Sequence, residues 1–155
     1  MSAKKLIGEC VVVDLDGTLA DAEHRMRYYR DGKLDWAHFE APENIPNDQL
    51  HHIVAEVVKL LRQKWPIIYV SGRKDTCYDV TVDWLKKHDL WHPPALLLMR
   101  NRKDSRHDYE VKKDILDELI GRGYRPILSL DDRNSVVQMW RDNGIPCFQV
   151  ADGDF

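Results

Sequence analysis

The sequence predicts an α/β fold built around a parallel sheet. Short apolar runs recur along the chain, and stretches with helical periodicity separate most of them. Continuous apolar runs are typical of strands buried on both faces, and alternation of strands with helices favours parallel pairing. With 155 residues, 43% of them hydrophobic, the chain is long enough for a sizeable core, and we expect one domain over residues 1–155.

Composition narrows the class of protein. The formal net charge of −3 excludes a protein that is basic overall and binds nucleic acid through bulk charge. The three cysteines lack zinc-ligand or disulfide spacing, and Cys10 and Cys147 fall in apolar runs where we expect small buried thiols. No apolar run approaches the length of a membrane span, and the N-terminal residues lack the apolar core of a signal peptide. We therefore expect a cytoplasmic protein without membrane contact.

The first predicted strand ends in two acids. Cys10–Val13 is a β-branched apolar run, and Asp14 and Asp16 follow it on the same side of an extended backbone. Gly17 then permits a turn. Two like charges at the end of a buried strand are costly unless a cation or a shared proton offsets them, so the pair indicates a metal site or acid–base chemistry. The alternative is an ordinary polar turn between a strand and a loop.

A polar and aromatic segment follows, over residues 21–47. We expect it to form a short excursion over the sheet end, with a helical turn near Trp36–Glu40, because it is too short for a second domain. A helix capped by Asn47 or Asp48 and continuing to about Lys64 should come next. Its predicted apolar face consists of Leu50, Ile53, Val54, Val57, Val58 and Leu61.

The rest of the chain continues the alternation of strands and helices. Further strands are predicted over 67–70, 95–99, 126–130 and 147–150. The helices between them should run from a cap at Asp75 past Leu85, from about Val111 to Ile120, and over 135–143. A mostly basic loop follows the strand over 95–99. It either contacts nucleic acid or is an ordinary exposed loop. Its basic residues are Arg100, Arg102, Lys103, Arg106 and His107.

Polar and charged residues follow the ends of several predicted strands. Ser71, Gly72 and Arg73 follow the second, and Asp131 and Asp132 follow the fourth. Ligands of such sheets bind beyond the carboxyl ends of the strands, where these residues would join the first acid pair. This coincidence favours a functional site over a chance turn.

The residue types suit phosphoryl transfer. The carboxylate of Asp14 could attack phosphorus and form an aspartyl-phosphate, while Asp16 moves the proton. Magnesium prefers oxygen ligands, which Asp14 and either Asp131 or Asp132 would supply. Ser71, the backbone N–H of Gly72 and a lysine would bind the phosphate oxygens.

Four segments carry a resemblance to a known family. Asp-Leu-Asp-Gly-Thr, Val-Ser-Gly-Arg, a lysine and Leu-Asp-Asp-Arg match, in order, the four motifs of the haloacid-dehalogenase-like phosphatases. Over nearly the whole chain the sequence is similar to the 3′-phosphatase domains of bacteriophage polynucleotide kinase/phosphatases. The resemblance implies a three-layer Rossmann-like fold of the haloacid-dehalogenase type with a minimal cap at about 21–47.

The resemblance also implies a role for individual residues. Asp14 would be the nucleophile and Asp16 the general acid and base, with Mg²⁺ as cofactor. Lys112 stands where the family places its motif lysine, with Lys113 as the alternative. The phosphate-binding residues would be Thr18, Arg25, Ser71, Gly72, Arg73, Lys112 and Arg133, and the metal ligands would be Asp14, Asp16, Asp131 and Asp132.

These observations lead to one principal hypothesis and two rivals. The principal one is a magnesium-dependent phosphatase that removes 3′-terminal phosphates from RNA or DNA ends in repair, because a small cap leaves the site open to a polymer. The first rival is a phosphatase of free nucleotides that uses the same residues. The second is a non-catalytic module that binds nucleic-acid ends. The chain lacks the G-x-x-x-x-G-K-[ST] loop of a kinase, so the resemblance concerns the phosphatase half alone.

Overall fold

A five-stranded parallel sheet forms the centre of the protein. The computed structural model describes residues 7–30 and 32–155. The strands lie in the order β7-β6-β1-β8-β9, and every neighbouring pair is parallel, as the sequence predicts. Their bounds are Gly8–Val13 for β1, Ile67–Lys74 for β6, Leu96–Arg100 for β7, Tyr124–Asp131 for β8 and Cys147–Gln149 for β9.

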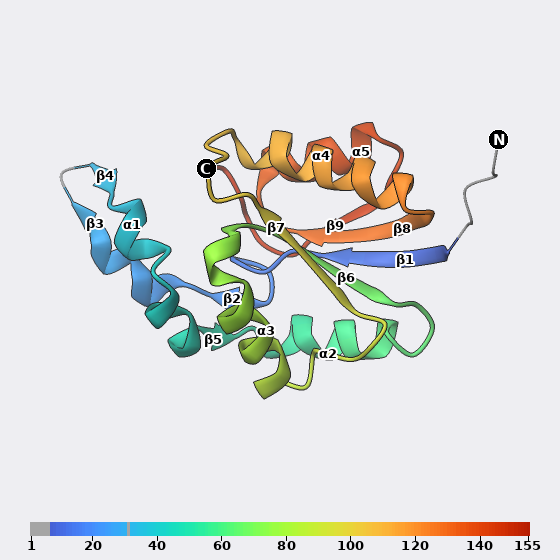
Figure 1. Ribbon diagram of the computed structural model, residues 1–155, viewed down its shortest axis with the longest axis horizontal. Helices are drawn as coiled ribbons and strands as arrows, with labels where there is room; N and C mark the ends of the chain where they lie inside the picture. The colour runs from blue at the N-terminus through green and yellow to red at the C-terminus, as the bar shows by residue number, and fades with distance from the viewer. Residues whose placement is uncertain (1–6, 31) are drawn as a thin grey trace.

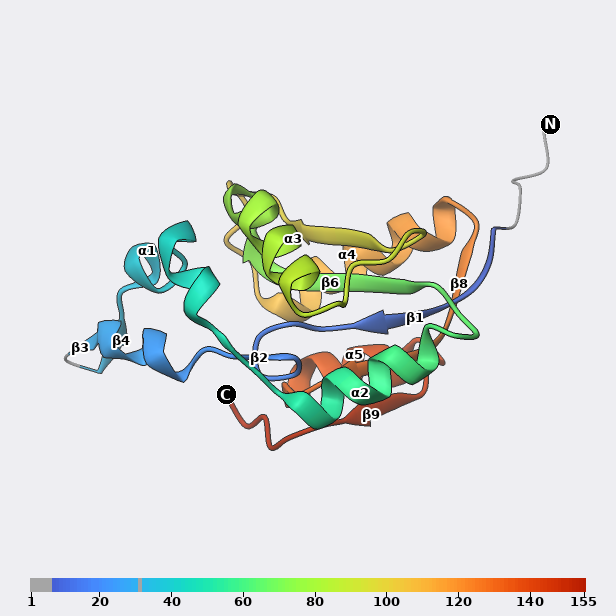
Figure 2. The same ribbon diagram turned by 90° about the horizontal axis from the view of Figure 1, so that it is seen from below.

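Helices cover both faces of the sheet and complete a three-layer arrangement (Figure 1). In Figure 1, α4 and α5 lie above the sheet and α2 and α3 below it; in Figure 2, which looks from below, α2 and α3 are in front. The four helices span His52–Leu61, Tyr78–Lys87, Asp108–Gly121 and Asn134–Asp142, in that order. Among the described residues, no helix is both long and apolar enough to cross a membrane. This layering confirms the predicted α/β, Rossmann-like class.

The side chains of β1 alternate between two hydrophobic cores, because successive residues of a strand point to opposite faces. Val11 and Val13 are fully buried and belong to the core that α2 and α3 cover. Cys10 and Val12 belong to the core beneath α4 and α5. The continuous apolar run therefore reflects a strand buried on both sides. Burial of β1 from both faces fixes the place at which the acids after it emerge.

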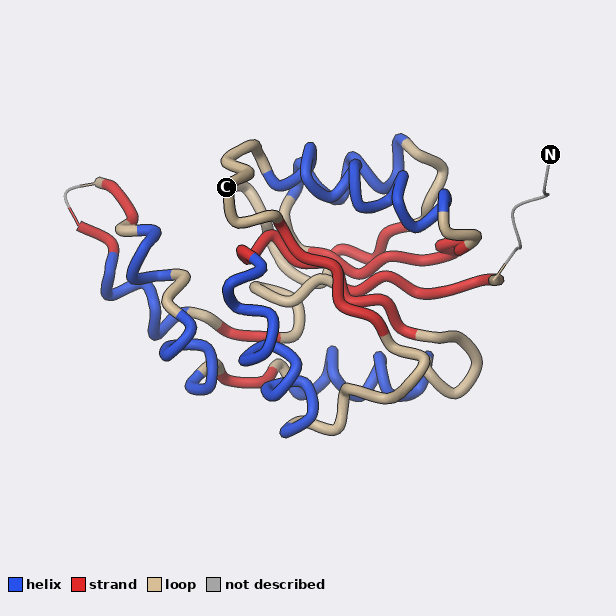
Figure 3. Tube along the Cα trace, in the orientation of Figure 1, coloured by secondary structure: helices blue, strands red, loops and turns tan. Residues whose placement is uncertain are grey.

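The segment over residues 21–47 stands beyond the carboxyl ends of the strands (Figure 3), and we call it the insert. It consists of short elements, among them the predicted helical turn, here α1 at Trp36–Phe39. It also contains η1 Glu23–Tyr28, β3 Tyr29–Arg30, β4 Lys33–Leu34 and η2 Pro42–Asn47, and β3 pairs antiparallel with β4. Strand β2 (Ala20–Asp21), where the insert begins, pairs antiparallel with β5 (Gln49–Leu50), just beyond its end. A further short element, η3, spans Asp75–Cys77 and precedes α3.

Two predicted helix caps are wrong. Helix α2 begins at His52, so neither Asn47 nor Asp48 caps it, and the side chain of Asp48 binds arginines instead. Asp75 does not cap α3, which begins three residues later at Tyr78; its carboxylate accepts from Arg102 Nε at 2.8 Å. In both places an arginine from a distant segment competes with the local backbone for the carboxylate.

Two further expectations need adjustment. Strand β6 continues past Val70 to Lys74, so that Ser71 and Arg73 lie within the strand rather than after it. The apolar face of α2 is only partly buried: Val58 is fully buried, whereas Ile53 is 78% exposed and Leu50 belongs to β5. A single helix in contact with one sheet face buries only the stripe that faces the sheet, and Ile53 lies outside that stripe.

Candidate active site

Three carboxylates meet at the carboxyl edge of the sheet. Asp14 follows β1, and Asp131 and Asp132 stand at the end of β8. One ligand oxygen from each lies within 4.8 Å of the others, and all three residues are buried. The pairing of β1 with β8 sets Val13 beside Leu130, which brings the acids after each strand together. The strand register alone therefore builds this cluster.

A buried lysine neutralises part of the acid cluster. Lys112 projects from α4 and is only 2% exposed, so it is not an ordinary solvated helix lysine. Its Nζ donates to Asp14 Oδ1 at 2.7 Å and to Asp131 Oδ2 at 2.9 Å. Burial acts to lower the pKa of Lys112, but the nearby carboxylates outweigh burial and raise it, so the amine is charged. The alternative residue, Lys113, pairs on the helix surface with Asp117.

The two oxygens of Asp14 have different partners. Thr18 Oγ1 donates to Oδ2 at 2.9 Å, while Lys112 holds Oδ1. Burial raises the pKa of Asp14 well above its usual range, and the charges of Asp131 and Asp132 raise it further, against the lowering effect of Lys112. The carboxylate is thus oriented by hydrogen bonds within a crowded group of like charges.

The acid cluster fits a hard divalent cation. Three buried carboxylates offer the oxygen donors that magnesium prefers. The pKa of Asp132 is also raised, by burial and by the charge of Asp131. A cation at this position would offset the repulsion that raises both values. The Asp16 carboxylate is not a member of this group of three among the described residues.

Asp16 faces two arginines instead. Arg73 donates from Nε to Oδ2 at 2.9 Å and from Nη2 to Oδ1 at 2.7 Å, and Arg25 donates from Nη2 to Oδ1 at 2.6 Å. Burial would raise the pKa of Asp16, but the Arg73 and Arg25 guanidiniums outweigh that effect and hold it well below the usual range. Arg25 comes from the insert and Arg73 from β6, so Asp16 joins the insert to the sheet.

Sequence reasoning missed the partner that both arginines share. The Asp48 side chain is fully buried and accepts from Arg25 Nε at 3.0 Å, from Arg25 Nη2 at 2.9 Å and from Arg73 Nη2 at 3.0 Å. His24 Nε2 lies 2.6 Å from the same carboxylate. Asp48 and Asp16 together compensate the two guanidiniums. The position of Asp48 before a helical pattern is typical of a helix cap. Its true partners, Arg25 and Arg73, are distant in the chain, and the local sequence does not indicate them.

The segment predicted to bind phosphate oxygens lies at the end of β6. Ser71 is buried, and its Oγ accepts the backbone N–H of Arg73 at 3.1 Å. The carbonyl of Gly72 accepts from Arg100 Nε at 2.8 Å. A Cβ on Gly72 would overlap the Asp108 carboxylate, so the backbone and that acid are in close contact.

Asp108 is a second acid that sequence reasoning missed. Its Oδ1 accepts from Arg100 Nη2 at 2.6 Å and its Oδ2 from Arg133 Nη1 at 3.0 Å. It thereby links the end of β7 to the segment after β8. A local signal was present, because Asp108 opens α4 four residues before Lys112 and would share its helix face.

The basic loop after β7 is largely compensated by acids. Arg100 is the last residue of β7 and not, as the sequence predicted, part of the loop; it is buried and takes part in the contacts described above. Arg102 pairs with Asp75, and Arg106 pairs with Asp104 and Asp114. Contact of this loop with nucleic acid stays a prediction, and the ion pairs reduce the free positive charge that would support it.

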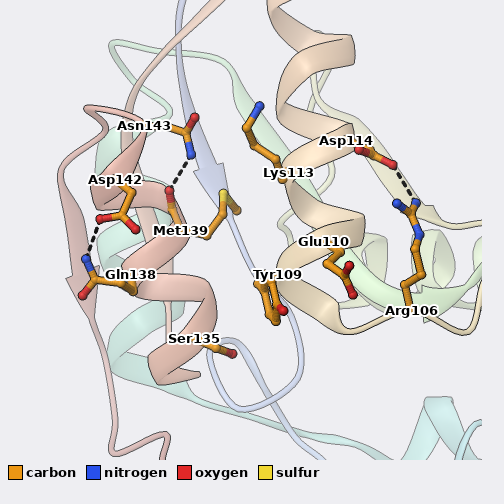
Figure 4. A pocket seen from close by; sticks show the side chains of 10 residues that line it. All are labelled: Arg106, Tyr109, Glu110, Lys113, Asp114, Ser135, Gln138, Met139, Asp142 and Asn143. Carbon is orange, nitrogen blue, oxygen red and sulfur yellow. Dashed lines mark hydrogen bonds and ion pairs between the residues drawn. The ribbon is translucent and has the colours of Figure 1, made fainter.

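A pocket of about 600 Å³ lies away from the acid cluster, between α4 and α5 (Figure 4). Tyr109 and Lys113 line it from α4, and Gln138 and Met139 line it from α5. Of the residues predicted to be catalytic, phosphate-binding or metal-binding, only Lys113, the alternative to Lys112, lines this pocket. The chemistry of the candidate site is at the sheet edge.

The protein shares the fold of haloacid-dehalogenase-like proteins of known structure. Several solved proteins share this fold at low sequence identity. One is a class C acid phosphatase from Bacillus anthracis, which is 19% identical with a TM-score of 0.67. The match covers 99% of the present chain and 69% of that protein. A haloacid dehalogenase-like hydrolase from Streptococcus pneumoniae is 15% identical with a TM-score of 0.60, over 93% of this chain and 84% of its own.

Within that class, the sequence model for the "polynucleotide kinase PNKP phosphatase domain" matches residues 8–155. The chain belongs to this family.

Two relatives are more similar in sequence. A protein from Autographa californica nuclear polyhedrosis virus, described as a bifunctional polynucleotide kinase/RNA ligase, is 32% identical over 139 residues, which is 88% of this chain and 18% of that protein. A chain in the structure of the Pnkp1/Rnl/Hen1 RNA repair complex is 36% identical with a TM-score of 0.77, over 95% of this chain and 43% of its own. The present chain therefore spans less than half the length of either relative.

Proposed function

We propose that the protein is a magnesium-dependent phosphomonoesterase that removes the 3′-terminal phosphate from RNA or DNA ends. The observation that carries the proposal is the convergence of Asp14, Lys112 and the acid pair after β8 in a member of the polynucleotide kinase phosphatase-domain family. The two relatives whose names refer to polynucleotide kinase and RNA repair support nucleic-acid ends as the substrate.

In the first step, a carboxylate oxygen of Asp14 bonds to phosphorus, and the bond from phosphorus to the 3′ oxygen breaks. Asp16 donates a proton to that oxygen, which leaves as a hydroxyl group. In the second step, Asp16 takes a proton from water, whose oxygen attacks the aspartyl-phosphate. Inorganic phosphate leaves and the Asp14 carboxylate is restored.

Other residues position these groups. Thr18 and Lys112 orient the Asp14 carboxylate, as their hydrogen bonds of 2.9 and 2.7 Å indicate. Ser71 and the backbone N–H of Gly72 bind non-bridging oxygens. Arg25 and Arg73 keep Asp16 ionised in the free protein, and a bound phosphate would compete for their N–H groups and let Asp16 take up its proton.

Asp14, Asp131 and Asp132 would hold the magnesium ion. When bound, the ion reduces the repulsion between an anionic nucleophile and an anionic phosphate. The donor set agrees with this assignment because all three residues offer carboxylate oxygens.

A phosphate-release assay tests the proposal. The purified protein with Mg²⁺ is given a 3′-phosphorylated oligonucleotide, the matching 5′-phosphorylated oligonucleotide and free nucleoside 3′-monophosphates. We expect the highest kcat/KM on the 3′-phosphorylated oligonucleotide, because the insert is too small to enclose a mononucleotide. Faster turnover of mononucleotides would support the nucleotidase alternative, and binding of oligonucleotide ends without turnover would support a non-catalytic module.

A further inference from the structure

An exposed aromatic ring stands beside the candidate site. The Phe155 side chain belongs to a residue that is 69% exposed, and the guanidinium carbon of Arg133 lies 4.7 Å from the centre of its ring. Arg133 in turn donates to Asp108 at 3.0 Å. Asp108 is in close contact with the backbone of Gly72, which is predicted to bind phosphate. A continuous series of contacts therefore leads from the phosphate-binding segment to the ring.

The backbone of this segment is fixed against the end of β8. The N–H of Asn134 donates to the carbonyl of Gly153 at 2.9 Å, and the N–H of Phe155 donates to the same oxygen at 3.0 Å. A Cβ on Gly153 would overlap the carbonyl of Asp132, so the two backbones touch. The chain ends at the same edge of the sheet from which the insert projects (Figure 1). The ring is thus held near the acid cluster.

Packing of the protein core does not account for the position of this ring. Large aromatic residues that serve the core are almost fully buried, as Trp84 and Trp140 are at 2% and 1% exposure. The Arg133 guanidinium over the Phe155 ring has its own acid partner and restrains the ring, while Phe155 stays largely exposed. An open ring that is restrained in this way loses little freedom when a second flat group stacks on it.

We propose that Phe155, supported by Arg133, is a stacking platform for the base of the nucleotide that carries the phosphate to be removed. This inference rests on the proposed function, which brings a nucleotide to the acid cluster. Phenylalanine offers a π-face and no hydrogen-bonding group, so the platform would accept any base. The site would therefore recognise the presence of a base and not its identity.

Two substrates that differ only in the base test this proposal. One is a short oligothymidylate with a 3′-phosphate, and the other is the same oligomer with an abasic terminal nucleoside that carries the phosphate. For wild-type protein with Mg²⁺, we expect kcat/KM to be roughly five- to fifty-fold higher on the substrate with the base. Phe155→Ala should remove this preference by slowing the first substrate alone, and Phe155→Trp should keep it.

A matched control is available in Phe148, an exposed residue of β9. Phe148→Ala should leave both rates unchanged. If Phe155→Ala slows both substrates equally, or if the wild type shows no preference for the base, the platform does not exist. Thermal unfolding of the Phe155 variants checks that the fold is intact, and Phe155→Leu replaces alanine if the smaller residue unfolds the protein.

The failure of the proposed function gives a different result. In that case the wild type would hydrolyse a small monoester such as glycerol 2-phosphate but neither oligonucleotide. A direct binding measurement adds a second readout. In an Asp14→Asn background, fluorescence of a terminal 2-aminopurine should be quenched when Phe155 is present and regained in Phe155→Ala. Equal quenching in both proteins would contradict stacking on this ring.

Discussion

Asp14 and Asp16 are two residues apart, yet the protein shifts their pKa values in opposite directions. Burial and the charges of Asp131 and Asp132 raise the pKa of Asp14. The guanidiniums of Arg73 and Arg25 outweigh burial and lower the pKa of Asp16. Alternation along the backbone would place both side chains on one side, but Asp14 accepts from Lys112 of α4, whereas Asp16 accepts from Arg25 of the insert and Arg73 of β6. The free protein thus holds two chemically identical residues in opposite electrostatic surroundings, and substrate must loosen the Arg25 and Arg73 contacts before Asp16 can donate a proton.

The first prediction concerns Asp14→Asn. We expect phosphatase activity to fall at least about a thousand-fold, because the attacking carboxylate is lost. We also expect the metal-free protein at pH 7 to become more stable, by on the order of 1 kcal/mol. A folded-state pKa above the unfolded value means that ionised Asp14 destabilises the fold, increasingly as the pH rises from 4 towards 7. Asparagine stays neutral and removes this cost.

Phosphate release and urea unfolding in EDTA at pH 4 and pH 7 measure the two effects. The gain in stability should be larger at pH 7 than at pH 4. An active Asp14→Asn variant would contradict the covalent mechanism. A variant that is less stable than the wild type at pH 7 would show that hydrogen bonds to Thr18 and Lys112 outweigh the repulsion.

The second prediction concerns Asp48, whose removal should leave two buried guanidiniums short of negative charge. Asp48→Asn should destabilise the protein by roughly 3–5 kcal/mol, because it breaks a buried ion pair by removing one partner. Activity should fall as well, since Arg25 and Arg73 lose the anchor that positions them. Urea unfolding and kcat/KM on a 3′-phosphorylated oligonucleotide measure both effects.

Asp35→Asn provides the control for Asp48. Asp35 is also an acid of the insert, but it is exposed and caps α1 by accepting the N–H of His38. Its replacement should cost no more than about 1 kcal/mol and leave kcat/KM unchanged. Equal losses in the two variants would mean that the insert depends on acids generally and that Asp48 has no special role.

At the scale of elements, the periodicity of the sequence predicts the strands and helices that neighbouring residues determine. It misses the features that depend on contacts between residues far apart in the chain. The five strands lie within a few residues of their predicted places, because β-branched runs between helices leave few alternatives. The helix caps at Asp48 and Asp75 are wrong because arginines far along the chain bind those acids. Likewise, Arg100 belongs to a loop by composition but is buried by its contacts with Gly72 and Asp108.

The third prediction concerns the turn after β1. Gly17 has a φ of 83°, and a Cβ there would overlap the Asp132 carboxylate. Gly17→Ala should therefore add roughly 1–2 kcal/mol of backbone strain and displace Asp132, a proposed metal ligand, so both stability and activity should fall. Urea unfolding and phosphate release measure the two losses.

Two other glycines separate the causes. Gly144 has a φ of 78° but open space around it, so Gly144→Ala should lose stability through strain alone and keep its activity. Gly121 ends α4 with open space and no positive φ, so Gly121→Ala should be neutral or stabilising by about 0.5–1 kcal/mol. Loss of activity in Gly144→Ala would show that the assay responds to stability and not to the site.

At the scale of the whole molecule, the fold concentrates charge at one edge. Acids at the ends of β1 and β8, a lysine from α4 and arginines from β6 and the insert meet there, and the hydrogen bond from Lys112 to Asp14 joins residues 98 positions apart in sequence. The order of the strands makes this meeting predictable, since β6, β1 and β8 are neighbours and all end on the same side. The pairing of each charge is not predictable in this way, because it depends on side-chain packing that periodicity does not encode.

The last prediction follows from this concentration of charge. A cation that binds the folded protein and not the unfolded chain stabilises it, by about 2.7 kcal/mol at a hundred times its dissociation constant. For a chain of this size, that corresponds to a rise of about 5–10 °C in Tm. We expect this rise when Mg²⁺ is added to EDTA-treated wild-type protein.

Asp131→Asn and Asp132→Asn should reduce this rise in Tm sharply, because each removes one of the three clustered carboxylates. Asp117→Asn, which removes an exposed acid on α4, should leave the rise unchanged. A rise that persists in both cluster variants would place the cation elsewhere and remove the metal site from the proposed mechanism.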